Sequence, residues 1–249
     1  MTTAAAIRHS LRTYYVPGRA AALDGFYARF LGPGELGFDV GSHVGDRSAS
    51  FLRLGARALA VEPQPRLARL LRLLHGRTPG FTLVSALVGA EAGTATLRVN
   101  SKNPTVASAS ADFIAAATGA EGWEGQVWDT ELTLPVTTLD ALAAEHGAPD
   151  FLKIDVEGYE AVALSGLSRP PRSLSFEFTT IQRGVAADCM GRLAALGYRH
   201  FNACLGEGMR FAHETPLTAA AMADWIAALP HAANSGDVYA SLEPARLAP

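Results

Sequence analysis

The chain has 249 residues, of which 49% are hydrophobic and 18% are charged, and its formal net charge is -3. This composition is typical of a packed globular enzyme and argues against both a long disordered chain and a protein that binds nucleic acid through a general positive charge. No apolar run approaches the roughly 20 residues of a membrane span, and the opening segment lacks the apolar core of about 7 to 15 residues found in secretion signals.

Short apolar runs alternate with helical patterns along the chain, which predicts one α/β domain with a doubly wound, mostly parallel sheet covered by helices. The first strand is predicted over residues 36–40, followed by a turn and a helix over 47–54 that Gly55 ends. A second strand is predicted over 58–61. The helix predicted over 65–75 carries apolar residues at i, i+3, i+4 and i+7.

The middle of the chain contains a predicted hairpin and a segment of biased composition. A buried strand over 81–88 and an alternating strand over 94–99 flank the turn EAG, so we expect the two to pair with each other. Residues 101–130 are rich in Ala, Ser and Gly, with Trp123 and Trp128 near the end, and are predicted to be an insertion.

The second half of the chain returns to the alternation of strands and helices. Thr137, with Asp140 three residues on, resembles a capping box and predicts a helix that runs to His146. The last strand is expected at an edge of the sheet. The other elements predicted after residue 130 are the strands 131–136, 151–156, 174–178, 198–203 and 237–240 and the helices 185–196 and 215–229.

Residues 38–46, with the sequence FDVGSHVGD, place Gly41 and Gly45 between a buried strand and a helix. Glycines in this segment, whose residues 41–45 we call the glycine turn, allow the backbone to approach a ligand at the carboxyl end of the strand. His43 stands where the second glycine of the dinucleotide fingerprint would be, which disfavours NAD or FAD. A tight turn that binds no ligand is the alternative interpretation.

Glu62 ends the second predicted strand, about 20 residues after Gly41. A carboxylate at this place can accept hydrogen bonds from both hydroxyls of a ribose, so the glycine turn and Glu62 together predict a nucleoside site. A glutamate at a strand end is also a common solvent-facing residue.

Acidic side chains follow two later strands. The segment LKIDVEGYE leads a buried strand into Asp155 and Glu157, and Glu177 lies near the end of the next one. Because burying an unpaired charge is costly, Lys153, Asp155 and Glu157 are expected either to pair with one another or to meet a ligand.

Several of these motifs, taken together and in order, resemble the FkbM-type methyltransferases, a branch of the class I methyltransferases that use S-adenosylmethionine (SAM). The resemblance covers about residues 36–240. Glycine turns are weak signals alone, whereas VTTLD followed by LKIDVEG is specific. The matching segments are FDVGSHVGDRS, AVEPQP, LVSALVG, VTTLDAL, LKIDVEG, SFEF and GDVYA.

The resemblance implies a Rossmann-like, seven-stranded methyltransferase domain over residues 36–249, preceded by a helical or extended segment over 1–35. Residues 101–130 match the family poorly, so the substrate is expected to be recognised there.

The resemblance also implies a cofactor site. It places the glycine turn around the methionine part of SAM, Glu62 at the ribose, and Ser85 with Ala86 near the adenine. The family more often has Asn in place of His43, so whether this side chain contacts cofactor, substrate or neither stays open. The cofactor-binding residues expected on this basis are Asp39, Gly41, His43, Gly45, Glu62, Pro63, Ser85, Ala86 and Asp155.

The implied reaction is methyl transfer from SAM to a hydroxyl oxygen of a small molecule such as a sugar or secondary metabolite. A hydroxyl must lose its proton, and the residues at strand ends that could accept it are Asp155, ranked first, Glu177, ranked second, Glu157 and His43. These side chains could also bond to cofactor or backbone without proton transfer. N- or carboxyl methylation, a catalytically silent SAM-binding module and a nicotinamide oxidoreductase are the alternatives.

Neither the histidines nor the cysteines predict a metal site. The 7 histidines show no HExxH-like pairing, and the 2 cysteines, Cys189 and Cys204, have neither metal nor redox spacing. The cysteine content favours a reducing, cytoplasmic compartment. The sequence leaves the oligomeric state open, and a homodimer is compatible with it.

Overall fold

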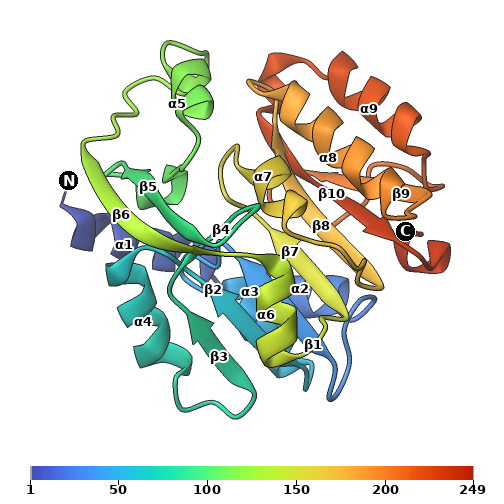
Figure 1. Ribbon diagram of the computed structural model, residues 1–249, viewed down its shortest axis with the longest axis horizontal. Coiled ribbons are helices and arrows are strands. Elements are labelled where there is room, and N and C mark those ends of the chain that lie inside the picture. Colours follow the sequence, from blue (N-terminus) through green and yellow to red (C-terminus); the bar gives the residue numbers. More distant parts are fainter. Residues whose placement is uncertain (1, 249) are drawn as a thin grey trace.

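Among residues 2–248, which the computed structural model describes, seven strands form the central sheet (Figure 1). Their order is β3-β2-β1-β7-β8-β10-β9, and β10 runs antiparallel to both of its neighbours while the other pairs are parallel. This confirms the mostly parallel α/β class that the sequence predicts. The strands are β1 (Leu36–Val40), β2 (Arg57–Val61), β3 (Phe81–Val84), β7 (Phe151–Ile154), β8 (Ser173–Thr179), β9 (His200–Leu205) and β10 (Ser235–Ser241).

The topological switch of the sheet lies between β1 and β7. The chain runs from β1 outward through β2 to β3, and later returns to place β7 on the other side of β1. Because the connections that leave β1 and β7 lead to opposite sides, a crevice opens outside their carboxyl ends, and ligands of such sheets bind there. The fold therefore brings the glycine turn, which follows β1, next to Asp155, which follows β7.

Helices cover both faces of the sheet, and the alternation of side chains along each strand divides the core in two (Figure 1). In β7, Leu152 and Ile154 belong to the cluster formed with α6, α7, α8 and α9, whereas Phe151 packs against α2 and α3. The central strands are therefore apolar on both faces, as parallel strands usually are. The helices are α1 (Thr3–Tyr14), α2 (Arg19–Tyr27), α3 (Asp46–Arg53), α4 (Pro65–His75), α6 (Leu139–His146), α7 (Glu160–Ser165), α8 (Arg183–Ala195) and α9 (Ala219–Ala228).

A second sheet of three strands replaces the predicted hairpin. Its strands, in order across the sheet, are β4 (Leu87–Val88), β6 (Thr130–Thr137) and β5 (Gly93–Val99). The strand predicted over 81–88 divides into β3 and β4, and its expected pairing with 94–99 is wrong because β6 lies between β4 and β5. The physical reason is the length of the pairing: all of β5 pairs with β6, whereas β4 offers only Leu87 and Val88, and Leu87 packs into the apolar cluster of β5 and β6.

Three differences from the prediction concern the position of β10, the start of α6 and the presence of α7. β10 lies between β8 and β9 and is not the expected edge strand, and its Val238 and Ala240 are fully buried. The N-cap of α6 is Thr138, whose hydroxyl accepts a hydrogen bond from the amide of Ala141. The predicted cap, Thr137, still belongs to β6. No sequence pattern predicts α7, because its 6 residues are too few to show a helical period.

Residues 101–130 fold around their own aromatic cluster. They contain two short helices, η1 (Pro104–Val106) and α5 (Ala111–Ala117). Phe113 packs edge-on against both Trp123 and Trp128, and the Trp128 indole donates a 2.7 Å hydrogen bond to the carbonyl of Val106. The two tryptophans therefore tie the end of the segment to its beginning.

Both cysteines, Cys189 and Cys204, are buried and free. Across residues 2–248, no helix combines the length and the apolar character that crossing a membrane requires. The cellular compartment stays a prediction.

Candidate active site

A cavity of about 390 Å³ opens outside the carboxyl ends of the central strands. The loops that follow β1, β2, β7 and β9 line it, together with the end of β8, residues 104–107, Trp123 and Tyr14 of α1. The lining includes the predicted site residues Asp39, Gly41, His43, Glu62, Pro63, Ala86, Asp155, Glu157 and Glu177. Gly45 and Ser85, which were predicted with them, lie outside the lining.

The two glycines of the glycine turn serve contacts within the chain. Gly41 has φ +81°, and a Cβ atom there would overlap the backbone oxygen of Asp155. Gly45 has φ +82°, and its Cβ would lie 2.5 Å from Cδ2 of Leu71 in α4. The close approach inferred from the sequence is therefore an approach of the turn to the end of β7 and to α4, and Gly45 faces the helix instead of the cavity.

His43 is held in the same turn with a left-handed backbone, φ +49°. Its amide donates a 2.9 Å hydrogen bond to Oε2 of Glu62, and its ring meets the ring of Tyr14 edge-on at 5.7 Å. Ring atom Nε2 lies 3.4 Å from the hydroxyl of Thr105. Burial lowers the pKa of His43 to about 4, so the imidazole is neutral at pH 7.

Glu62 closes β2 with both carboxylate oxygens facing backbone amides. The residue is 2% exposed, and its oxygens accept hydrogen bonds from His43 at 2.9 Å and Gln64 at 2.8 Å. Burial raises the pKa of Glu62 to about 8. Each oxygen keeps a second lone pair, so the carboxyl group can still accept bonds from a ligand. Ser85, by contrast, is exposed and accepts a bond from Arg72 outside the cavity.

These shifts predict that the protein without ligand loses stability between about pH 6.5 and pH 8. The pKa of Glu62 is about 8 in the folded chain against a usual 4.5, so its contribution is complete below pH 4.5 and is lost as the pH rises through 8. Burial also raises the pKa of Glu160 to about 7, which adds to the loss. The lowered pKa of His43 acts in the opposite direction, but only below about pH 6.5.

Urea unfolding at pH 6.5 and pH 8 measures this change. We expect Glu62→Gln to remove its own part of this change and to leave the part of the other buried glutamates with raised pKa values, since each proton bound on unfolding or released by it changes the stability by about 1.4 kcal/mol per pH unit. Glu145→Gln is the matched control, because its side chain is 76% exposed. A wild-type free energy of unfolding that rises over this range, or a Glu62→Gln protein with an unchanged pH dependence, would contradict the prediction.

Three carboxyl groups line the cavity where β7 and β8 end. Asp155 and Glu157 follow β7, which stops at Ile154 and not at the predicted residue 156, and Glu177 belongs to β8. One oxygen of each group lies within 4.8 Å of the others. Burial, followed by the charge of Asp155, raises the pKa of Glu157 and of Glu177 well above the usual value. The fold thus brings together the acids that the sequence singles out.

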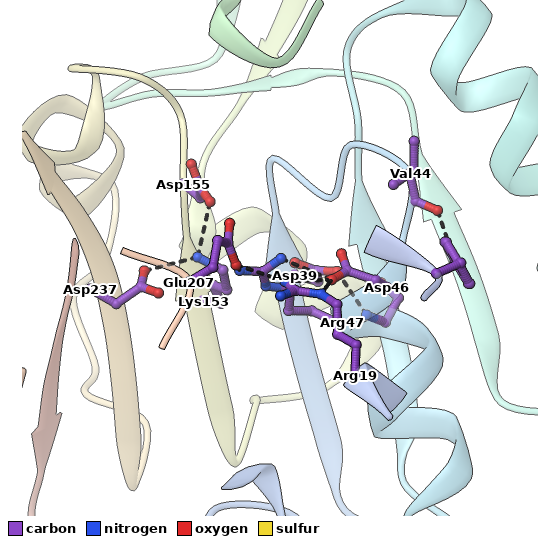
Figure 2. Close-up of polar contacts among 11 residues, drawn as sticks. Arg19, Asp39, Val44, Asp46, Arg47, Lys153, Asp155, Glu207 and Asp237 are labelled. Carbon is purple, nitrogen blue, oxygen red and sulfur yellow. Dashed lines mark hydrogen bonds and ion pairs between the residues drawn. The ribbon is translucent and has the colours of Figure 1, made fainter. Parts of the chain in front are cut away.

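Lys153 supplies a positive charge beside one of these acids, Asp155 (Figure 2). The residue is 2% exposed, and Nζ donates 3.0 Å hydrogen bonds to Oδ2 of Asp155 and to Oδ1 of Asp237. Burial alone would lower the pKa of Lys153, but the two aspartates outweigh burial and raise it well above its usual value. Lys153 and Asp155 therefore pair, one of the two outcomes expected, while Asp237 is a partner that sequence reasoning missed.

A second ionic network joins the start of α3 to the loop after β9 (Figure 2). Arg47 binds Asp46 at 2.9 Å and Glu207 at 2.5 Å, and Arg19 binds the same two carboxylates at 3.2 and 2.7 Å. Burial alone would raise the pKa of Glu207, but Arg47 and Arg19 lower it to about 2. Arg47 and Glu207 also line the cavity, yet they are 160 residues apart and no motif connects them.

Asp39 directs its carboxylate at the first turn of α3. Its Oδ2 accepts a 3.0 Å hydrogen bond from the amide of Ser48 and a 2.6 Å bond from the hydroxyl of the same residue. Burial raises the pKa of Asp39, and the Ser48 donors offset part of this rise. Asp39 therefore anchors the helix, and its predicted contact with the methionine part of SAM stays a prediction.

Comparison with known proteins connects this site to a family. A family model described as the methyltransferase FkbM domain matches residues 39–199, a range that contains the glycine turn, Glu62 and the three acids. The chain belongs to the FkbM methyltransferase family. It is thus a SAM-dependent methyltransferase. None of the curated proteins compared with it matches the chain.

Two solved structures of other methyltransferases are similar to this FkbM methyltransferase. A precorrin-6y C5,15-methyltransferase from Geobacter metallireducens is 14% identical, with 89% of this chain and 86% of that chain covered and a TM-score of 0.42. A TehB-like SAM-dependent methyltransferase from Corynebacterium glutamicum is 9% identical, with 89% and 88% covered and a TM-score of 0.44. At these identities and TM-scores the comparison says nothing about the methyl acceptor.

The residues of the cavity fit SAM, the cofactor that the family implies. Glu62 offers carboxylate lone pairs suited to ribose hydroxyls. Ala86, Leu87 and Val88 supply an apolar wall beside it, as a nucleobase requires. A cavity of about 390 Å³ is also within the range of pockets that hold small-molecule ligands.

Proposed function

We propose that this FkbM methyltransferase transfers the methyl group of SAM to a hydroxyl oxygen of a small-molecule acceptor, such as a sugar or another secondary metabolite. The observation that supports the proposal is the position of Glu62, Asp155 and Glu177 in the wall of a single cavity. A carboxyl group suited to a ribose and groups able to accept a proton therefore face the same space.

The cofactor end of the cavity is assigned from its lining. Glu62 holds the ribose, Pro63 and Ala86 flank the adenine, and Gly41 and His43 border the methionine part. Gly45 and Ser85 are left out of this assignment because they lie outside the lining. Bound SAM supplies a methyl group that is already activated by its positively charged sulfur. The chain itself needs to orient the acceptor, and good alignment of two reactants lowers a barrier by about 7 to 11 kcal/mol.

Asp155 is proposed to accept the proton of the acceptor's hydroxyl group. Its Oδ2 is fixed by the hydrogen bond from Lys153, and the side chain borders the cavity. Glu177 is the second candidate and Glu157 the third. Burial, followed by the charge of Asp155, raises the pKa of both glutamates well above the usual value, and neither has the contact with an ammonium group that Asp155 has.

The acceptor is proposed to bind against the insertion over 101–130. Pro104, Thr105 and Val106 of this segment line the cavity, and Trp123 lines it as well. The Trp123 indole nitrogen is buried without a hydrogen-bond partner among residues 2–248. A polar atom of an acceptor would satisfy this donor, which is a further reason to place the acceptor here.

Calorimetric titration with SAM tests the cofactor assignment. We expect the wild-type protein and the Glu145→Gln control to bind SAM, and Glu62→Gln to bind it about 10- to 100-fold more weakly. In the variant an NH₂ group replaces one carboxylate oxygen. This NH₂ group faces a backbone N–H and cannot accept a hydrogen bond from a ribose hydroxyl, which costs about 1.5 to 3 kcal/mol of binding free energy. Absence of SAM binding to the wild-type protein would refute the proposal, and equal affinity of Glu62→Gln would remove Glu62 from it.

A mass-resolved screen of candidate metabolites with SAM tests the reaction. The proposal expects the gain of one methyl group on a hydroxyl-bearing acceptor. A methyl group found only on amines or carboxylic acids would favour N- or carboxyl methylation. SAM binding without transfer to any acceptor would indicate a catalytically silent module.

The remaining expectations stand as proposals alongside this function. They are the division of the chain into 1–35 and 36–249, a cytoplasmic location, a small molecule and not nucleic acid as the partner, and an oligomeric state that includes the homodimer.

A further inference from the structure

We propose that Asp155, Glu157 and Glu177 together bind one divalent cation with a preference for oxygen ligands, such as Mg²⁺ or Mn²⁺, in the wall of the cavity. This inference departs from the sequence-based expectation of no metal, which rested on histidine and cysteine spacing. It concerns the same cavity as the proposed function but does not depend on SAM.

The spacing of the three carboxyl groups suits a shared ion. Their oxygens lie within 4.8 Å of one another. Cations that bind oxygen at about 2.0 to 2.6 Å hold the oxygens of one shell roughly 3 to 5 Å apart. The groups come from the ends of β7 and β8, which are neighbouring parallel strands, so the sheet holds them in place.

The side chain of Glu157 is buried and has no partner, which is a second observation in favour of a bound ion. The residue is 8% exposed, and among residues 2–248 no hydrogen bond or ion pair reaches its carboxyl oxygens. Oε2 of Glu177 is likewise buried and unpartnered. Polar groups buried without partners cost free energy, and an ionised carboxylate costs more than a neutral group does. Such groups facing a cavity indicate that a ligand satisfies them.

The local charge also favours a cation. Lys153 is the ammonium that contacts this group, and it is shared between Asp155 and Asp237. No positive charge remains for Glu157 or Glu177 among the described ion pairs. Lys153 binds one lone pair of Oδ2 of Asp155, so Oδ1 is left for the ion and the second lone pair of Oδ2 for the proton of the proposed reaction. Three carboxyl groups without histidine or cysteine select Mg²⁺, Mn²⁺ or Ca²⁺ over Zn²⁺.

A cation at this place would present its remaining coordination positions to the cavity. Oxygen atoms of the acceptor would complete the shell, so the site would favour acceptors with neighbouring oxygens over isolated hydroxyls. The cation would therefore act as a specificity element of the acceptor side.

The test is a titration of the purified 249-residue chain with Mn²⁺, without SAM, in which free Mn²⁺ is measured by electron paramagnetic resonance. We expect one Mn²⁺ per chain with a Kd below about 1 mM, which is the weak end for protein sites of this type, and displacement by Mg²⁺. Glu157→Gln and Glu177→Gln should weaken binding at least about 10-fold. The exposed variants Glu145→Gln and Asp224→Asn should bind as the wild type does.

A second measurement guards against loss of folding. Circular dichroism establishes that each variant is folded, and Mn²⁺ should raise the unfolding temperature of the wild type but not of Glu157→Gln. No binding to the wild type, or equal binding to both cavity variants, would overturn the inference. If methyl transfer proceeds unchanged in EDTA and Mn²⁺ does not bind, the cation site fails while the proposed function stands. If Mn²⁺ binds but SAM does not, the proposed function fails while the cation site stands.

Discussion

Asp155→Asn is expected to lower kcat by about 10² to 10⁴-fold while the affinity for SAM stays within a few-fold of wild type. The amide keeps the shape of the side chain and can still accept the hydrogen bond from Lys153, but it cannot take up the proton of a hydroxyl group. The position at the end of β7, bordering the cavity beside the glycine turn, is what makes this side chain the proton acceptor of the proposed reaction.

The measurement is steady-state turnover with an identified acceptor, together with SAM calorimetry on the same protein. Asp224→Asn, an exposed aspartate of α9, is the matched control and should leave both quantities unchanged. Glu177→Gln is expected to lower kcat less than Asp155→Asn does. Turnover of Asp155→Asn close to that of the wild type would remove Asp155 from the chemistry, and a parallel loss of SAM affinity would make it a binding residue instead.

Elements whose pattern is local follow closely from the sequence. β1 is predicted with its observed bounds, and so is α4, because Pro65 can open a helix and its apolar residues then recur with a helical period. The cavity at the strand ends also follows, since topology alone places the glycine turn, Glu62 and Asp155 at one edge of a doubly wound sheet.

Features that depend on distant partners do not follow from the sequence. β6 separates β4 from β5, although a short turn joins those two strands in the sequence. The bond from Lys153 to Asp237 spans 84 residues. Gly45 and Ser85 have the expected residue types at the expected motif positions, but which way each faces is decided by α4 and by Arg72. Packing between elements, which no local pattern encodes, therefore set the limit of the prediction.

Gly41→Ala is expected to destabilise the protein by about 2 kcal/mol or more, in addition to the backbone strain of an alanine with a positive φ. The added Cβ would overlap the backbone oxygen of Asp155, and backbone atoms cannot rotate away as a side chain can. The turn and the end of β7 would have to separate, and such overpacking costs about 1 to 3 kcal/mol or more. Because Asp155 moves with its backbone, turnover should fall together with stability.

Gly34→Ala separates the two causes of this loss. Gly34 has φ +82°, nearly the same as Gly41, but a Cβ there meets nothing within 4 Å. Its replacement should therefore cost only the backbone strain, about 1 to 2 kcal/mol, and leave turnover intact. Urea unfolding of both variants gives the difference directly. If Gly41→Ala is no less stable than Gly34→Ala, the contact between the glycine turn and β7 does not require glycine, and the tight junction at the switch of the sheet is not what positions Asp155.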